Sequence, residues 1–277
     1  MLTRPIPRTG EQLPVIGLGT WQTFDVGPSP AARAPLVEVL RRFLDGGARV
    51  IDSSPMYGNA EQATGDLLGQ LGDVGEAKRP FLATKVWTRG RAQGIEEMNR
   101  SFQRMGTEVM DLMQIHNLLD WQAHLPVLRD WKSKGRIRYI GITHHIHGAF
   151  PEMEKILRTE AVDFVQLPYN VADREAEKRL LPAAKDTGTA VLVMRPFDEG
   201  ALLRRLRDEP LPPWAETELD CTSWSQLLLK FILGHPAVTC PIPATSNPEH
   251  LEDNLRAGQG RIPDENARKR IVQAARM

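Results

Sequence analysis

The 277-residue chain has few cysteines, no excess charge of either sign and no long hydrophobic run. Its two cysteines, Cys221 and Cys240, lie far apart and form no CxxC motif, which argues against a zinc ribbon or a redox dithiol. Lysine plus arginine and aspartate plus glutamate number 35 each, so the basic excess typical of nucleic-acid or anionic-membrane proteins is missing. No segment approaches the roughly 18 uncharged apolar residues of a membrane helix. We therefore expect no nucleic acid and no membrane among its partners.

The N-terminal residues also lack the apolar run of a signal peptide. This favours a cytoplasmic location, unless an export signal has been removed. The 41% hydrophobic and 25% charged residues are ordinary for a globular protein with a sizeable core, which excludes a disordered or fibrous chain. The length suits one large α/β barrel or two ordinary domains.

Short apolar runs alternate with longer amphipathic stretches along the chain. The predicted strands lie at 15–19, 48–51, 81–84, 110–115, 137–142, 162–167, 190–194 and 239–242. The predicted helices include 34–44, 60–71, 96–104, 121–134, 174–185 and 222–233. Strand and helix alternating eight times within roughly 250 residues is typical of a (β/α)8 TIM barrel. We therefore predict an α/β fold in which residues 1–277 form a single (β/α)8 TIM barrel domain.

Some segments fall outside this repeat. Residues 6–13 resemble a turn between two short strands, which predicts an N-terminal β-hairpin cap on the barrel floor. Residues 198–220 contain three prolines and predict an extended loop, and a short tail ends the chain. The competing doubly wound nucleotide fold requires G-x-G-x-x-G after the first strand, and residues 17–22 supply only the first two glycines.

Polar side chains end three consecutive predicted strands, namely Asp52, Lys85 and His116. Active sites of such barrels form at the carboxyl ends of the strands. Because neighbouring parallel strands lie about 4.8 Å apart, these three side chains should converge at one edge of the barrel mouth. Tyr57 follows Asp52 by five residues and can reach the same place.

The ionisation of these side chains indicates their chemistry. An aspartate keeps a neighbouring lysine charged, and an ammonium beside a phenol lowers the phenol pKa from its reference near about 10. We therefore predict that Tyr57 is a general acid near neutral pH. A neutral His116 would hydrogen-bond a carbonyl oxygen and orient it toward the phenol. The set suits protonation of an oxygen whose carbon accepts a hydride, and it needs no metal.

A series of motifs in order along the chain carries a family resemblance. They are GLGTW at 17–21, IDSSPMYGNAE at 51–61, TKV at 84–86, LMQIH at 112–116, IGIT at 140–143, QLPYN at 166–170 and IPATSNPEH at 242–250. With these motifs the sequence resembles the aldo-keto reductase family from end to end. The resemblance implies a (β/α)8 barrel that binds NADP(H) in extended form and reduces aldehydes or ketones. By the same match Asp52, Tyr57, Lys85 and His116 fall on the catalytic tetrad, with Tyr57 as the acid.

The resemblance also implies where the cofactor binds. Gln166 matches the ligand of the nicotinamide carboxamide, and an amide can pair with an amide through one donor and one acceptor. Thr143 and His144 stand where the family usually has Ser-Asn, while Met194 and Arg195 occupy the place where many members present a stacking aromatic residue. The full predicted cofactor-binding set is Gly19, Thr20, Trp21, Asp52, Thr143, His144, Gln166, Met194, Arg195, Pro196, Phe197, Thr245, Ser246, Asn247, His250 and Asn254.

The choice between NADP(H) and NAD(H) depends on the segment 244–254. Many NADPH-specific members place a lysine and an arginine where this chain has Ala244 and His250, and losing two cations weakens the hold on a 2′-phosphate. Thr245, Ser246 and Asn247 still supply hydroxyls and an amide before a predicted helix, whose N-terminus favours phosphate. We predict NADP(H), with NAD(H) as the alternative.

Residues that follow the predicted strands also indicate a substrate pocket. Trp21, Trp87, Met56 and Asn117 are expected to line an open, apolar pocket for a small carbonyl substrate. The histidines between 144 and 147 have no cysteine and no fixed second ligand set, so we expect no metal. Two acidic residues of the predicted 60–71 helix, at 61 and 66, are expected to face solvent.

The leading functional prediction is NADPH-dependent reduction of aldehydes or ketones by direct hydride transfer. An NAD(P)-dependent alcohol or sugar dehydrogenase is one alternative, because the reaction is reversible. A cofactor-sensing, non-catalytic regulatory subunit is another, which the retained tetrad disfavours. A barrel that acts on sugars would need paired catalytic carboxylates. A monomer or a small homo-oligomer is expected.

Overall fold

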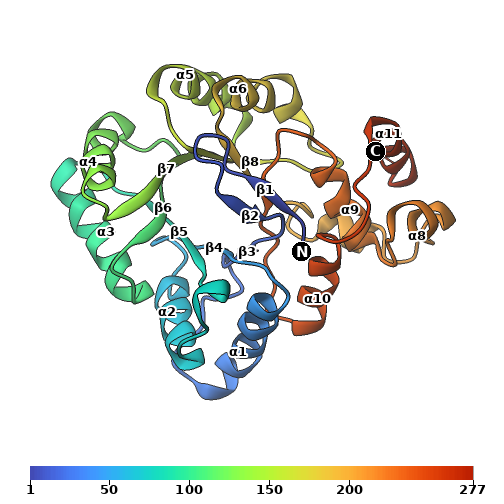
Figure 1. Cartoon of the computed structure of the whole chain (residues 1–277), viewed down its shortest axis with the longest axis horizontal. Helices are drawn as coiled ribbons and strands as arrows, with labels where there is room; N and C mark the ends of the chain where they lie inside the picture. Colours follow the sequence, from blue (N-terminus) through green and yellow to red (C-terminus); the bar gives the residue numbers. More distant parts are fainter. Residues whose placement is uncertain (277) are drawn as a thin grey trace.

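Eight short, buried strands form the centre of the protein, seen here in a computed structural model that describes residues 1–276 (Figure 1). They are β3 (Leu18–Gly19), β4 (Val50–Asp52), β5 (Phe81–Val86), β6 (Met110–His116), β7 (Ile137–Thr143), β8 (Phe164–Pro168), β9 (Ala190–Met194) and β10 (Cys240–Pro241). Each strand pairs in parallel with its neighbour in sequence order. All eight predicted strands are therefore confirmed.

The first and last strands close the sheet into a barrel. The amides of Gly17 and Gly19 donate to the carbonyl oxygens of Pro241 and Pro243 at 2.9 and 3.2 Å. Gly19 also pairs in parallel with Ala244. A Cβ on Gly19 would lie 2.9 Å from the carbonyl oxygen of Ile242, so only glycine permits this close approach. The predicted (β/α)8 fold is thereby confirmed.

Helices surround the barrel, as Figure 1 shows. They are α1 (Pro30–Asp45), α2 (Ala60–Leu71), α3 (Arg91–Met105), α4 (Trp121–Ser133), α5 (Phe150–Glu160), α6 (Leu180–Thr187), α7 (Ala201–Arg205), α8 (Pro213–Leu219), α9 (Trp224–Leu233), α10 (Pro248–Arg256) and α11 (Glu265–Ala274). Short 3-10 turns lie at η1 (Glu76–Lys78), η2 (His147–Ala149) and η3 (Glu175–Lys178). No helix among residues 1–276 is both long and apolar enough to cross a membrane.

One predicted helix and one predicted loop differ from the structure. The predicted helix at 174–185 is divided into η3 and α6, with Arg179 between them in a non-helical conformation. The segment 198–220 is not one extended loop, because it contains α7 and α8. Pro213 is the first residue of α8, where a missing N–H breaks no helical hydrogen bond, so the proline starts a helix here.

An N-terminal hairpin closes the end of the barrel at which the strands begin. Its strands, β1 (Thr3–Pro5) and β2 (Gln12–Pro14), pair antiparallel as predicted. Ile6 and Leu13 are buried in one cluster with the first residues of several barrel strands, Phe81 among them. The opposite end, where the strands finish, is left for the site.

Candidate active site

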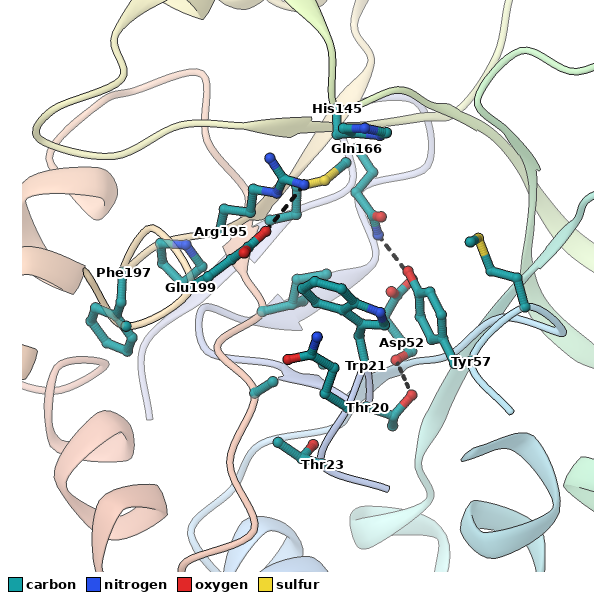
Figure 2. A pocket seen from close by; sticks show the side chains of 18 of the residues that line it. Thr20, Trp21, Thr23, Asp52, Tyr57, His145, Gln166, Arg195, Phe197 and Glu199 are labelled. Carbon is teal, nitrogen blue, oxygen red and sulfur yellow. Dashed lines mark hydrogen bonds and ion pairs between the residues drawn. The ribbon is translucent and has the colours of Figure 1, made fainter. Parts of the chain in front are cut away.

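A cavity of about 510 Å³ opens where the barrel strands end (Figure 2). Predicted residues that line it are Gly19, Thr20, Trp21, Asp52, Met56, Tyr57, His116, Asn117, Gln166, Met194, Arg195, Pro196 and Phe197. Residues not predicted from the sequence also line it, namely Gln22, Thr23, His145, Glu199, Gly200, Leu203, Ile242 and Ala244. The cavity thus gathers one end of the predicted cofactor site and most of the predicted substrate pocket.

Asp52, at the end of β4, holds three buried side chains through its two carboxylate oxygens. The Lys85 ammonium donates to Oδ2 at 2.7 Å and to the carbonyl oxygen of Ser53 at 2.7 Å. The amide nitrogens of Gln114 and Gln166 donate to Oδ1, each at 2.9 Å. Burying an ion pair costs less when hydrogen bonds satisfy its remaining atoms, so this network supports a charged lysine inside the barrel.

The Lys85 ammonium lies 4.9 Å from the centroid of the Tyr57 ring. Burial lowers the pKa of Lys85, but Asp52 and Tyr57 together raise that pKa above its ordinary value, so the amine stays charged. Burial raises the pKa of Tyr57, and the charge of Lys85 opposes this without reversing it. The predicted lowering of the Tyr57 pKa is therefore wrong for this structure, because the cost of burying a phenolate outweighs the attraction of the ammonium.

His116 lies at the end of β6, with its ring edge-on to Tyr57 at a centroid distance of 6.0 Å. Its Nδ1 is 3.0 Å from the hydroxyl oxygen of Ser54. Burial, followed by the charge of Lys85, lowers the pKa of His116 to about 2. The imidazole is therefore neutral and can hydrogen-bond a substrate oxygen at neutral pH.

The predicted substrate residues do not all line the cavity. Trp21 and Met56 stand at its mouth and are 38% and 39% exposed, and the amide oxygen of Asn117 lies 3.3 Å from Nδ1 of His145. Trp87 is 41% exposed and lies outside the cavity lining, although its ring centroid is 6.3 Å from that of His116.

Several predicted cofactor residues also lie outside the cavity lining: Thr143, His144, Thr245, Ser246, Asn247, His250 and Asn254. Thr143 is buried and its hydroxyl donates to Oε1 of Gln166 at 3.3 Å. Asn247 is the N-cap of α10, where its side chain accepts from the amide of Glu249 at 2.8 Å. Asn254 is buried and accepts from the Ser225 hydroxyl at 2.6 Å, so its amide oxygen is engaged within the fold.

One wall of the cavity carries an ion pair in an unusual backbone segment. Arg195 and Glu199 lie 3.2 Å apart, as the dashed line in Figure 2 shows. Arg195, Asp198 and Glu199 all have positive φ angles, between 49° and 54°, which few residues other than glycine adopt. The fold therefore holds this loop in a costly conformation beside the cavity.

The sequence reading missed several residues that shape this site. Gln114 lies two residues before His116 on β6, so both side chains point to the same face of the strand, and this period could have identified it. Ser54 lies two residues after Asp52 but beyond the end of β4, so the same period could not have identified it. His145 and Glu199 follow strands in loops whose course the sequence did not predict. Within residues 1–276, no group of three His, Cys, Asp or Glu side chains is arranged to hold a metal ion.

The solvent exposure predicted for the two acidic residues of α2 is wrong for one of them. Glu61 is 1% exposed, accepts from the Thr84 hydroxyl at 2.6 Å and faces Arg104 at 3.4 Å. It lies on the same buried face of α2 as Ala60 and Thr64, which explains its burial. Asp66 is exposed, as predicted.

Comparison with known proteins agrees with this geometry. The model of the aldo/keto reductase family matches residues 15–273. The chain therefore belongs to the aldo-keto reductase family, whose members are NAD(P)H-dependent oxidoreductases.

Individual relatives are similar at modest identity. The chain is 28% identical to the aldo-keto reductase YhdN of Bacillus subtilis over 74% of its own length and 64% of that protein, so it spans just under two thirds of this relative. It is 26% identical to the methylglyoxal reductase YeaE of Escherichia coli over 87% of this chain and 84% of that protein. A crystal structure of an aldo/keto reductase from Klebsiella pneumoniae in complex with NADP and acetate is 26% identical. It superposes with a TM-score of 0.76 over 95% of this chain and 92% of that chain.

Proposed function

We propose that this protein reduces aldehydes or ketones to alcohols with NADPH, with Tyr57 as the general acid. The observation that supports this best is the buried Asp52–Lys85 pair beside Tyr57 at the end of the barrel. It provides a protonated phenol next to a fixed positive charge, in a cavity large enough for a small organic molecule. The Klebsiella pneumoniae relative that binds NADP supports the cofactor.

The cavity residues fit the nicotinamide end of such a cofactor. Gln166 presents an amide at the cavity wall, and Met194 and Phe197 present apolar surface. Arg195 supplies a cation suited to a phosphate, although Glu199 holds it in this structure. These residue types match an amide-bearing aromatic ring joined to a phosphate.

The segment expected to hold the adenosine end of the cofactor lacks the lysine and the arginine that many NADPH-specific members place there. The backbone amide of Asn247 donates to the Thr245 hydroxyl at 3.1 Å, so part of the polar surface of this segment is already hydrogen-bonded. The N-terminus of α10 carries the positive end of a helix dipole, and Ser246 and His250 lie exposed beside it. This supports binding of NADP(H) without a dedicated lysine–arginine clamp, and NAD(H) is the alternative that the experiment below distinguishes.

Each residue then has a defined task in the proposed reaction. When bound, the reduced cofactor supplies a hydride to the carbonyl carbon. Tyr57 holds on its hydroxyl oxygen the proton that the carbonyl oxygen takes, and Lys85 stabilises the phenolate that remains. Asp52 keeps Lys85 charged and in place. His116 hydrogen-bonds the carbonyl oxygen and orients it toward Tyr57.

A two-stage titration tests the proposal. Tryptophan fluorescence is followed while NADPH, and separately NADH, is added, because Trp21 lies at the cavity mouth. Then 4-nitrobenzaldehyde is added and nicotinamide absorbance is recorded. Saturable binding followed by NADPH oxidation supports the reductase, whereas binding without NADPH oxidation in the presence of any of several aldehydes supports a cofactor-sensing subunit. A cytoplasmic location and a monomer or small homo-oligomer stay predictions, which cell fractionation and light scattering would check.

A further inference from the structure

Ser54 is a buried hydroxyl whose hydrogen bonds fix the direction of its contact with His116. The side chain is fully buried. Its oxygen lies 3.0 Å from Nδ1 of His116 and 3.3 Å from the backbone nitrogen of Met56. Within residues 1–276, no other hydrogen bond involves this hydroxyl.

The donor is fixed by chemistry in the contact between Ser54 and Met56, whereas either atom could be the donor in the contact between Ser54 and His116. The backbone N–H of Met56 can only donate, so the Ser54 oxygen accepts from it. The hydroxyl proton still needs an acceptor, because a buried donor without a partner is costly. Nδ1 of His116 is the acceptor that the described residues provide. Ser54 therefore donates to Nδ1, and Nδ1 carries no proton.

The state of His116 at its other nitrogen follows. A neutral imidazole carries one proton, so the proton lies on Nε2. Within the described chain no side chain or backbone group bonds Nε2, and the ring lines the cavity. An Nε2–H group facing the cavity can donate a hydrogen bond to the carbonyl oxygen of a substrate. This hydrogen bond becomes stronger as the oxygen gains negative charge during the reaction. The opposite tautomer would present a lone pair to the oxygen and repel it.

We propose that Ser54 is a positioning residue that holds His116 in the tautomer with the proton on Nε2, so that His116 donates to the substrate oxygen and Tyr57 remains the source of the transferred proton. The inference rests on the proposed carbonyl reduction for its catalytic consequence. The tautomer itself can be measured without any reaction.

The direct test is ¹⁵N NMR of the histidine rings in the unaltered protein near neutral pH, with His116 assigned by the signals lost in His116→Gln. We expect an unprotonated Nδ1 and a protonated Nε2 for His116. Ser54→Ala should give a mixture of tautomers, and Ser54→Thr, which keeps the hydroxyl, should restore the original pattern. A protonated Nδ1 in the unaltered protein, or an unchanged tautomer in Ser54→Ala, would overturn the proposal.

Kinetics supply the second readout. Ser54→Ala should lower kcat for 4-nitrobenzaldehyde about threefold to tenfold and change KM less than about twofold. The reason is that the Nε2-protonated tautomer of His116 matters mainly when negative charge develops on the carbonyl oxygen of the substrate. Ser101→Ala is the matched control, since Ser101 is a buried serine of α3 that donates to the carbonyl oxygen of Glu97. Equal kcat in the Ser54 and Ser101 variants would contradict the positioning role.

The two proposals fail in different ways. If the unaltered protein oxidises no NADPH with any aldehyde, the proposed function fails while the NMR result still decides the tautomer. If the unaltered protein is active but His116 carries its proton on Nδ1, the proposed function stands and the role of Ser54 is refuted. Because Ser54→Ala also leaves the Met56 amide without its partner, near-UV circular dichroism must first show that the variant is folded.

Discussion

At the scale of single residues, Asp52 organises the site because its two oxygens have different partners. One oxygen binds Lys85, and the other binds the amides of Gln114 and Gln166. The carboxylate therefore holds the Lys85 ammonium 4.9 Å from the centroid of the Tyr57 ring and ties the end of β4 to β6 and β8 at the same time. A change at Asp52 would disturb both the charge and the geometry, so it is a poor probe of either.

Tyr57→Phe is a cleaner probe of the proposed acid. We expect turnover of 4-nitrobenzaldehyde to fall by at least about 100-fold, since general acid catalysis contributes about that much or more. Binding of NADPH, followed by tryptophan fluorescence, should change less than about twofold. Tyr139→Phe is the control, because that hydroxyl contacts Glu11 and Thr9 at the other end of the barrel. Substantial turnover in Tyr57→Phe would contradict the assigned role.

The pH dependence of reduction follows from the two pKa shifts. The proposed reduction requires neutral His116 and protonated Tyr57. The pKa of His116 is lowered to about 2, so the histidine stays neutral as the pH falls from about 8 to 5. The pKa of Tyr57 is raised, so the proton is lost only above about pH 10. A plot of kcat/KM against pH should therefore show no titration at about pH 6.5, the ordinary pKa of histidine. A change of kcat/KM at that pH that disappears in His116→Gln would refute the neutral state of His116.

The same residues show where sequence reasoning stopped. The strand-end positions predicted that Asp52 and Lys85 meet, because strand spacing fixes that distance. The direction of the Tyr57 pKa shift could not be predicted, since it depends on how deeply the phenol is buried. Burial depends on loops from several parts of the chain, and the sequence shows only which residues are neighbours along it.

At the scale of elements, regular strands and helices were predictable, and the segments between them were not. The helix at 60–71 matches α2, because its apolar residues recur at the spacing of the face that the helix buries. The three prolines of 198–220 were read as loop residues, but one of them begins α8. Proline stops a helix or starts one according to its position, and the spacing alone did not distinguish these.

The loop between β9 and α7 gives a prediction about cofactor binding. Glu199 pairs with Arg195, the cation we expect to meet a cofactor phosphate. Glu199→Gln removes the competing carboxylate, so NADPH should bind about twofold to fivefold more tightly at low salt. The gain should shrink as salt screens the charges. Fluorescence titration at two salt concentrations measures it.

The control for that change is Glu216→Gln on α8, since Glu216 is exposed and lies outside the cavity lining. It removes one negative charge from the protein without freeing Arg195. If both variants tighten binding equally, net charge explains the effect and the pairing with Arg195 does not. Unchanged or weaker binding in Glu199→Gln would show that Arg195 does not meet a phosphate.

At the scale of the whole molecule, the two ends of the barrel have separate tasks. The strand ends carry Asp52 and His116, and the loop after β4 carries Tyr57, around the cavity. The strand beginnings are covered by the hairpin of β1 and β2, whose buried residues join the interior of the barrel. Changes to the hairpin should therefore alter stability and leave the chemistry of the site intact.

Ile6→Ala tests this separation. Ile6 is fully buried against the barrel interior, and truncating such a side chain leaves a cavity, so the free energy of unfolding should fall by about 2–4 kcal/mol. Urea denaturation followed by circular dichroism measures the loss. The matched control is Leu2→Ala, because Leu2 is 39% exposed and should lose far less. Below the unfolding transition, KM for NADPH should be the same in both variants. A raised KM in Ile6→Ala alone would mean that the hairpin shapes the distant cavity, and the barrel would then couple its two ends.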